Sequence, residues 1–208
     1  MKKILILTIF LLGFSVFATN ENPTNCPTTD KGVLINGIRW ATRNVDAPGT
    51  FAETPESPGM FFQWNRRKGW STEVEDWDNF WYSSIPEGWD NSNPEGTKWY
   101  AKNDPCPEGW RVPTFEELEI LENIDSEWVI KNGVNGRLFG IAPNQIFLPA
   151  AGRRGCIDGA LLDTGGGYWS STEDGCEHAW NFWFHSNIVD GVGWAWRTDG
   201  FLIRCVAK

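Results

Sequence analysis

The chain has few of the residues that most often bind metals or nucleic acids. It contains only two histidines, His178 and His185, and none of its cysteines forms a Cys-x-x-Cys pair. Structural zinc sites are built from such clusters, so the sequence predicts no metal centre. Acidic residues outnumber basic ones by 27 to 18. A protein of this charge is repelled by nucleic acid and by anionic membrane surfaces, so we expect neither partner.

Long apolar runs are absent except at the N-terminus. Lys2 and Lys3 precede an almost unbroken apolar stretch, residues 4–17, and Val16-Phe17-Ala18 ends in a small residue. This layout is typical of a secretory signal peptide and is too short for a membrane span. We predict cleavage after Ala18, export to the periplasm, cell surface or extracellular space, and no later insertion into a membrane.

The exported part, about 190 residues with a net charge of −11 once the signal is removed, is long enough for one domain with a core. Residues 19–32 are polar and rich in Pro and Thr, and we expect an extended tether there. No internal repeat or low-complexity linker follows. We therefore assign residues 1–18 to the signal, 19–32 to the tether and 33–208 to a single domain.

Local signals predict several elements. Asn36-Gly37 lies between two short apolar runs and indicates a two-residue hairpin turn. Residues 46–104 are rich in Pro, Gly, Asn and Asp, and we expect irregular loops there with one short strand at residues 60–64. Later runs such as "GRLFG", "QIFLPA", "GYWSST", "HAWNFWF", "VGWAW" and "GFLIRCV" favour antiparallel strands.

One long helix is expected after residue 113. Thr114 and Glu117 have the Thr-x-x-Glu spacing of a capping box. Leu118, Leu121, Ile124 or Asp125, and Trp128 recur at helical spacing, and Lys131-Asn132-Gly133 supplies the predicted stop. The predicted fold class is α+β, with small antiparallel sheets, one main helix and long irregular loops.

All five cysteines lie in the exported part, where disulfides are the default state. The preferred pairing is Cys106 with Cys205 and Cys156 with Cys176; other pairings stay open, because spacing does not fix connectivity. A Cys106–Cys205 bridge would close a loop of about 100 residues and stabilise the fold by up to ~4.7 kcal/mol. Cys26 is then left over, free or cross-linked to a second chain in a dimer.

Six ordered motifs together resemble one family. They are "INGIRWATRNV", "PGMFFQWNRR", "NDPCPEGWRVPTFEELEIL", "IFLPAAGRR", "GYWSST" followed by "AWNFWF", and the terminal "IRCV". The pattern is similar to the Fibrobacter succinogenes major paralogous domain over residues 33–206. Members of that family are exported or surface proteins, common in the Bacteroidetes and Fibrobacter lineages, and mostly lack an assigned activity.

The pattern also resembles, more distantly, the C-type-lectin-like fold shared with formylglycine-generating enzymes. That resemblance implies paired N- and C-terminal strands, with ligand-binding loops on the opposite side. The paired reactive cysteines of those enzymes have no counterpart in residues 186–203, so their oxidase chemistry is not expected.

Calcium is the alternative cofactor, although none is expected. The lectin-like triplets Ala142-Pro143-Asn144 and Trp180-Asn181-Phe182 lack the carboxylates that bind calcium in true C-type lectins. The "DNSNPEG" run from Asp90 favours a turn stabilised by Asn and Asp side chains over a calcium loop.

No motif indicates catalysis. Ser170-Ser171-Thr172 lacks the Gly-x-Ser-x-Gly surroundings of a hydrolase nucleophile. Asp76 with Asp78, or Glu173 with Asp174, could form the acid/base pair of a polysaccharide hydrolase, but that reading depends on a separation in space that spacing does not provide. We therefore predict no catalytic residue and keep the hydrolase as an alternative.

Twelve of the fourteen tryptophans fall into two groups. Six lie in strand, helix or family motifs and are predicted to be core: Trp40, Trp64, Trp110, Trp128, Trp169 and Trp180. Six lie in the polar middle segment or in the late loop, where rings edged by polar groups suit sugar faces or protein contacts: Trp70, Trp77, Trp81, Trp89, Trp194 and Trp196. The candidate ligand-binding residues are Trp194, Trp196, Arg153, Arg154, Arg197, Asp199, Trp70, Trp77, Trp81 and Trp89.

We predict an exported, non-enzymatic binding or adhesion module that recognises a glycan or a surface protein through aromatic loops. The first alternative is a structural cell-surface component without a small ligand. The second is the polysaccharide hydrolase.

Overall fold

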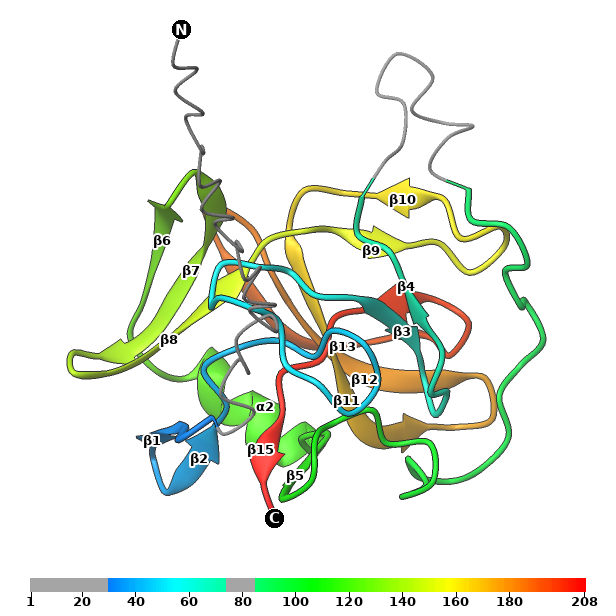
Figure 1. Cartoon of the computed structure of the whole chain (residues 1–208), viewed down its shortest axis with the longest axis horizontal. Helices are drawn as coiled ribbons and strands as arrows, with labels where there is room; N and C mark the ends of the chain where they lie inside the picture. Colours follow the sequence, from blue (N-terminus) through cyan, green and yellow to red (C-terminus); the bar gives the residue numbers. More distant parts are fainter. Residues whose placement is uncertain (1–29, 74–84) are drawn as a thin grey trace, which may run out of the picture.

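The computed structural model describes residues 30–73 and 85–208 (Figure 1). The predicted signal peptide and most of the predicted tether lie outside the described residues. Four residues of the site predictions also lie outside the described residues: Asp76, Trp77, Asp78 and Trp81. Cys26, through which a dimer was considered possible, lies outside them as well.

The described residues form small antiparallel sheets with one α-helix, which confirms the coarse α+β prediction. The first sheet joins the two ends of the chain, in the order β1-β2-β15-β5. Asn36 and Gly37 turn between its first two strands with φ of 46° and 85°, so the predicted hairpin is confirmed. Its strands are β1 (Val33–Ile35), β2 (Ile38–Trp40), β15 (Val206–Ala207) and β5 (Trp110–Arg111).

The second sheet gathers short strands from the middle and the end of the chain, in the order β10-β9-β14-β3-β4. The loop-rich residues 46–104 contribute β3 at the predicted position. The strands are β10 (Leu161–Leu162), β9 (Arg153–Arg154), β14 (Gly200–Phe201), β3 (Phe61–Gln63) and β4 (Gly69–Trp70).

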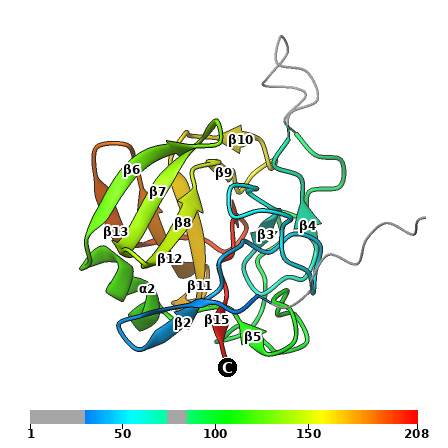
Figure 2. The same cartoon turned by 60° about the vertical axis from the view of Figure 1, so that its left-hand side comes forward.

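Two three-stranded sheets complete the fold. One contains β11 (Gly166–Asp174), β12 (His178–Phe184) and β13 (Val189–Trp196), and the other β6 (Ser126–Lys131), β7 (Val134–Ile141) and β8 (Asn144–Pro149). They pack face to face, as Figure 2 shows. The Phe139 ring of β7 lies 5.5 Å from the rings of both Phe182 and Phe184 on β12.

Helix α2 (Phe115–Glu122) begins as predicted but ends earlier. The Thr114 hydroxyl accepts the Glu117 N–H, and the Glu117 carboxylate accepts the Thr114 N–H, so the capping box is confirmed. The prediction that the helix continues to residue 131 is wrong. Residues 126–131 form β6, because Asn132 and Gly133, with φ of 51° and 83°, make a hairpin turn into β7 instead of a helix stop.

The core follows the tryptophan prediction in part. Trp40, Trp64 and Trp169 have no exposed surface and Trp110 is 9 % exposed. Two of the predicted core rings are only partly buried, Trp128 and Trp180. Trp128 lies on the edge strand β6 and packs against the core, whereas Trp180 lies on the central strand β12, with its ring 4.7 Å from that of Phe115.

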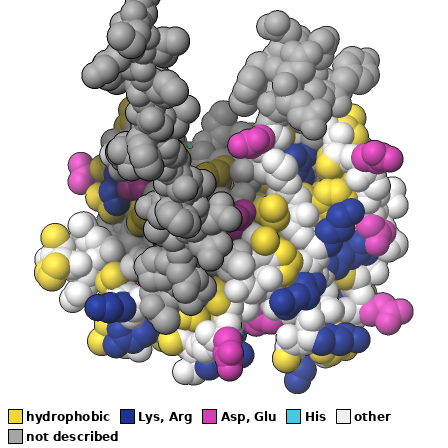
Figure 3. All heavy atoms as spheres, in the orientation of Figure 1, with side chains coloured by type: hydrophobic (Ala, Val, Ile, Leu, Met, Phe, Trp, Pro, Cys, Tyr) yellow, Lys and Arg dark blue, Asp and Glu magenta, His cyan; other side chains and the backbone are white. Residues whose placement is uncertain are grey.

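No helix among the described residues is both long and apolar enough to cross a membrane. On the face shown in Figure 3, Lys and Arg side chains lie beside Asp and Glu side chains. Charges of both signs are therefore mixed on this face, although the chain as a whole has a net charge of −9.

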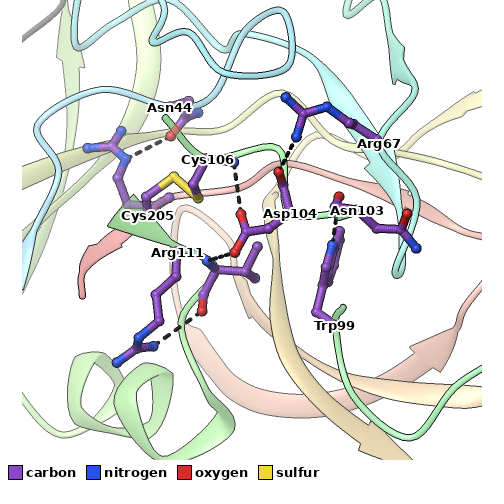
Figure 4. The surroundings of a disulfide bond; sticks show 10 residues. Asn44, Arg67, Trp99, Asn103, Asp104, Cys106, Arg111 and Cys205 are labelled. Carbon is purple, nitrogen blue, oxygen red and sulfur yellow. Dashed lines mark hydrogen bonds between the residues drawn. A yellow bond between two sulfur atoms is a disulfide. The ribbon is translucent and has the colours of Figure 1, made fainter. Parts of the chain in front are cut away.

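The predicted disulfide between Cys106 and Cys205 is present and joins positions 99 residues apart (Figure 4). The carboxylate of Asp104 accepts the backbone N–H of Cys106 at 2.9 Å and that of Val112 at 3.2 Å. Arg67 donates to the Asp104 backbone carbonyl. Burial raises the pKa of Asp104, against the effect of the two amides. These contacts fix the segment before α2 to the last strand.

The second predicted disulfide is not formed, because Cys156 and Cys176 are both free cysteines. The two cysteines lie in different turns, and the backbone carbonyl of each accepts a hydrogen bond from a different residue of the segment 89–93. Trp89 Nε1 donates to the Cys156 carbonyl, and Asn93 Nδ2 donates to the Cys176 carbonyl. The two thiols thus flank an intervening segment, a separation that chain spacing does not show.

Candidate functional site

Four of the predicted ligand-binding residues line one pocket of ≈ 420 Å³. Arg153 comes from β9, Trp194 and Trp196 from β13, and Asp199 from the turn before β14. The pairing of β9 with β14 brings residues 153 and 199 together. The other lining residues are Asp163, Asn181, Trp183, Gly193, Ala195 and Phe201.

An ion pair lies in this pocket. Arg153 Nη1 is 3.2 Å from Asp199 Oδ2, and the Asp199 side chain is only 1 % exposed. Burial raises the pKa of Asp199 to about 6, although the Arg153 guanidinium acts in the opposite direction. Among the described residues, Asp199 Oδ1 has no hydrogen-bond partner. A buried acceptor without a donor costs free energy, so this atom is suited to a hydrogen bond from a ligand.

Two aromatic rings lie at the open end of β13. Trp194 is 59 % exposed and Trp196 is 43 % exposed. Trp196 pairs with His178 and Trp194 pairs with Trp180, so all four side chains share one face of the sheet. The His178 ring lies 4.7 Å from Trp194 and 4.3 Å from Trp196. We call this exposed pair, with His178 behind it, the tryptophan surface.

The next residues on the same strands project from the other face, since side chains alternate along a strand. Asn181 is paired with Gly193, where its Nδ2 donates to the Gly193 carbonyl at 3.1 Å. Gly193 has no side chain and leaves open space over this face. Trp194 and Trp196 also line the pocket, so the tryptophan surface and the Arg153–Asp199 pair meet at the edge strand β13.

A polar cluster at the pocket rim was not predicted from the sequence. Trp183 Nε1 donates to His185 Nε2 at 2.6 Å. His185 also lies 3.9 Å from Asp163 and 3.4 Å from Asp190. The alternation of Asn181 and Trp183 on a predicted strand could have placed those two on one face. No sequence signal indicates that Asp163, from the turn after β10, reaches them.

Three of the predicted ligand-binding residues, Arg154, Arg197 and Trp70, are buried and do not line this pocket. Arg154 is 2 % exposed and donates to the carbonyls of Ser71 and Gly159. Arg197, also 2 % exposed, donates to several carbonyls and to the Glu173 carboxylate. Both guanidiniums hold loops together.

The Trp70 ring is only 6 % exposed, 4.9 Å from the partly buried ring of Trp89 and with Lys68 Nζ 3.7 Å above it. This aromatic group therefore packs loop residues 85–90 onto β4. Trp89 in turn donates to a backbone carbonyl, as described above, so neither ring belongs to the pocket.

Of the residues weighed for catalysis, Asp76 and Asp78 lie outside the described residues, and Ser170 and Glu173 have structural contacts. Ser170 is fully buried on β11. Glu173 is ion-paired with Arg197 at 3.0 Å, and Glu173 and Asp174 are successive residues of a strand, so their carboxylates face opposite sides. Burial, together with the Asp199 carboxylate, raises the pKa of Cys156, which keeps this thiol protonated.

The acidic run at residue 90 is a turn held by side chains, as predicted. Asp90 Oδ1 accepts the backbone N–H and the hydroxyl of Ser92, and its other oxygen is paired with Arg66. Within residues 30–73 and 85–208, no group of three or more His, Cys, Asp or Glu side chains is placed to hold a metal ion.

Comparison with protein-family models, with curated proteins and with solved structures finds no match for the chain.

Proposed function

We propose that the protein is an exported binding module that recognises a glycan at the tryptophan surface and the adjoining Arg153–Asp199 pocket, without catalysis of its own. The observation that carries this proposal is the exposure of Trp194 and Trp196, 59 % and 43 %, beside a pocket with an unpartnered buried carboxylate oxygen. Most other large aromatic rings among the described residues are buried. Exposing two tryptophan rings to water is unfavourable, which favours a functional reason for their position.

The chemistry of the two faces suits a sugar chain. Flat aromatic rings pack against the apolar C–H faces of sugars, and concave sites fix orientation with a few polar groups. In the pocket, Arg153 offers N–H donors and Asp199 Oδ1 offers an acceptor for neighbouring hydroxyl groups. The edge position of β13 lets one chain contact both faces. A glycan that stacks on Trp194 or Trp196 can therefore extend over the strand towards Asp199.

The finer fold assignment is part of the same proposal. A C-type-lectin-like arrangement is supported by the pairing of β15 with β2, which joins the two ends of the domain, and by the capped helix that follows "RVPT". The likeness to the Fibrobacter succinogenes major paralogous domain and the exported location rest on the motifs and the N-terminal run of the sequence.

A glycan array, followed by titration of the strongest hit against intrinsic tryptophan fluorescence, tests the proposal. We expect Trp194→Ala/Trp196→Ala to weaken binding at least tenfold, about 1.4 kcal/mol. Ile188→Ala, which removes a 49 % exposed side chain from the turn before β13, is the matched control and should bind normally. Absence of any glycan hit would refute the proposal. Release of reducing sugar from a hit would refute its non-enzymatic part.

A further inference from the structure

Strand β6 is an open sheet edge. It is the outer strand of the sheet β6-β7-β8 and pairs only with β7. Because Lys131 and Val134 flank a two-residue turn, they form a hydrogen-bonded pair, and alternate pairs along the hairpin do the same. The backbone groups of residues 127, 129 and 131 therefore point to β7. Those of Trp128 and Ile130 point outward, where no described residue bonds to them.

The comparable edge of the other three-stranded sheet is covered. At β13, the carboxylate of Glu122 at the end of α2 accepts the backbone N–H of Val192 at 3.3 Å, and it also packs against Gly191. An uncovered edge is a template for another strand. At β13 this contact is confined to residues 191 and 192, whereas on β6 neither outward-pointing residue has such a contact within the described part of the chain.

We propose that β6 pairs antiparallel with β6 of a second copy of this chain, about a two-fold axis at Val129. Trp128 of each copy then lies opposite Ile130 of the other. This register uses the outward-pointing backbone groups of both residues and makes four hydrogen bonds across the axis. The two three-stranded sheets become one six-stranded sheet.

The side chains of β6 complement themselves in this register. Glu127 comes opposite Lys131 of the second copy on one face, twice by symmetry, and opposite charges directly across an antiparallel pair are stabilising. On the other face, Ile130, which is 70 % exposed, packs on the partly buried Trp128 ring of the second copy. Charges at a sheet edge usually prevent pairing; here their spacing of four residues makes the strand attractive to its own copy.

The expected dimer is weak. Lys131 already lies 2.9 Å from Glu56, so it would bridge two carboxylates, and the copies each carry a net charge of −9. One pair of six-residue strands buries less than the roughly 1,000 Å² typical of stable interfaces. We expect a dissociation constant on the order of 10⁻⁵ M, strengthened where the protein is concentrated at a surface.

Sedimentation velocity over a wide range of protein concentration tests the interface. The exported chain with Cys26, Cys156 and Cys176 replaced by serine excludes dimers linked through a free thiol, and without reductant it keeps the Cys106–Cys205 disulfide. We expect a concentration-dependent dimer, weakened at least tenfold by Glu127→Lys, which opposes two lysines, and by Ile130→Lys. Ile141→Lys is the matched control, because Ile141 is 68 % exposed on the same hairpin but away from the β6 edge. It should leave the dimer unchanged.

Cross-linking tests the register. In a chain with Cys26, Cys156 and Cys176 replaced by serine, Val129→Cys places two thiols across the axis, and oxidation should give a disulfide dimer. Glu127→Cys places them four residues apart along the strand, ~13 Å, beyond the reach of a disulfide. Melting temperatures show that each variant is folded. A monomer at every concentration, equal weakening by Ile141→Lys, or equal cross-linking of both cysteine variants would overturn the proposal, whatever the glycan array shows.

Discussion

Strand β13 and the segment that follows it differ sharply in burial. All ten residues from Arg197 to Val206 are buried. In the eight residues before them, Trp194 and Trp196 are among the most exposed large side chains described. The chain therefore changes within three residues from a surface that can meet a ligand to a segment that holds the fold together.

Two arginines show what the difference means. Arg204 has 1 % exposure and donates to Asn44 Oδ1 and to the carbonyls of Ala41 and Phe147. Arg153, about a third exposed, forms an ion pair with the carboxylate of Asp199. A buried guanidinium whose donors reach several neutral carbonyls joins distant loops, whereas one that faces a pocket with a single partner can still bind a ligand.

Removing the disulfide gives the largest expected effect on the buried segment. We expect Cys106→Ala/Cys205→Ala to lower the free energy of unfolding by up to ~4.7 kcal/mol, because the bridge closes a loop of about 100 residues in the unfolded chain. The melting temperature should fall by about 10–15 °C in differential scanning calorimetry. Cys156→Ser/Cys176→Ser removes the same number of thiols without a bridge and should change it by no more than about 2 °C. Equal effects of both pairs would contradict this reading.

The two arginines provide the next test. Arg204→Leu leaves Asn44 Oδ1 and two buried carbonyls without donors, so we expect a loss of about 3–5 kcal/mol in urea unfolding. Arg153→Leu should cost less, about 1–2 kcal/mol, because the arginine itself is partly solvated, although the buried Asp199 carboxylate loses its cation. If both variants were destabilised equally, the distinction between the buried segment and the pocket would fail.

Signals that act over a few residues could be predicted from the sequence. The Asn36-Gly37 turn and the Thr114–Glu117 capping box depend only on local backbone geometry, and both are confirmed. The end of α2 could not be predicted in this way. The spacing of Leu118, Leu121 and Trp128 fits a helix, but pairing of residues 126–131 with β7 overrides it.

The candidate site, like the fold, could be predicted only where local spacing decides it. The two-residue spacing of Trp194 and Trp196 correctly places both on one face of a strand. Nothing in the sequence separates Arg153 from Arg197, because the burial of Arg197 depends on carbonyls of Pro94 and Gly96, about 100 residues away. Long-range backbone contacts decide which polar residues remain available, and a single sequence does not reveal them.

Asp199 gives a smaller, pH-dependent effect at the boundary between the two regions. Burial raises its pKa from 3.8 to about 6, so the folded protein binds more protons than the unfolded chain between those values. The free energy of unfolding therefore falls as the pH rises through this window. Asp199→Asn removes this loss, and its stability relative to the unsubstituted protein should rise by up to about 3 kcal/mol between pH 4 and pH 7.

Urea unfolding at several pH values measures the Asp199 effect. Asp163→Asn, which removes a 38 % exposed carboxylate from the same pocket rim, is the matched control for the loss of a charge there. A difference for Asp199→Asn that does not vary with pH would show that this carboxyl group titrates normally.

The smallest expected effect on stability is that of the tryptophan surface itself. Trp194→Ala should change the free energy of unfolding by less than about 1 kcal/mol, because the ring is mostly solvated and loses only its contact with His178. Trp169→Ala, on β11, removes a fully buried ring whose Nε1 donates to the Phe62 carbonyl at 2.7 Å, and should cost about 3–5 kcal/mol. Chemical denaturation of both variants checks the contrast. A large loss for Trp194→Ala would show that this ring supports the fold, and its exposure would then no longer favour a role in binding.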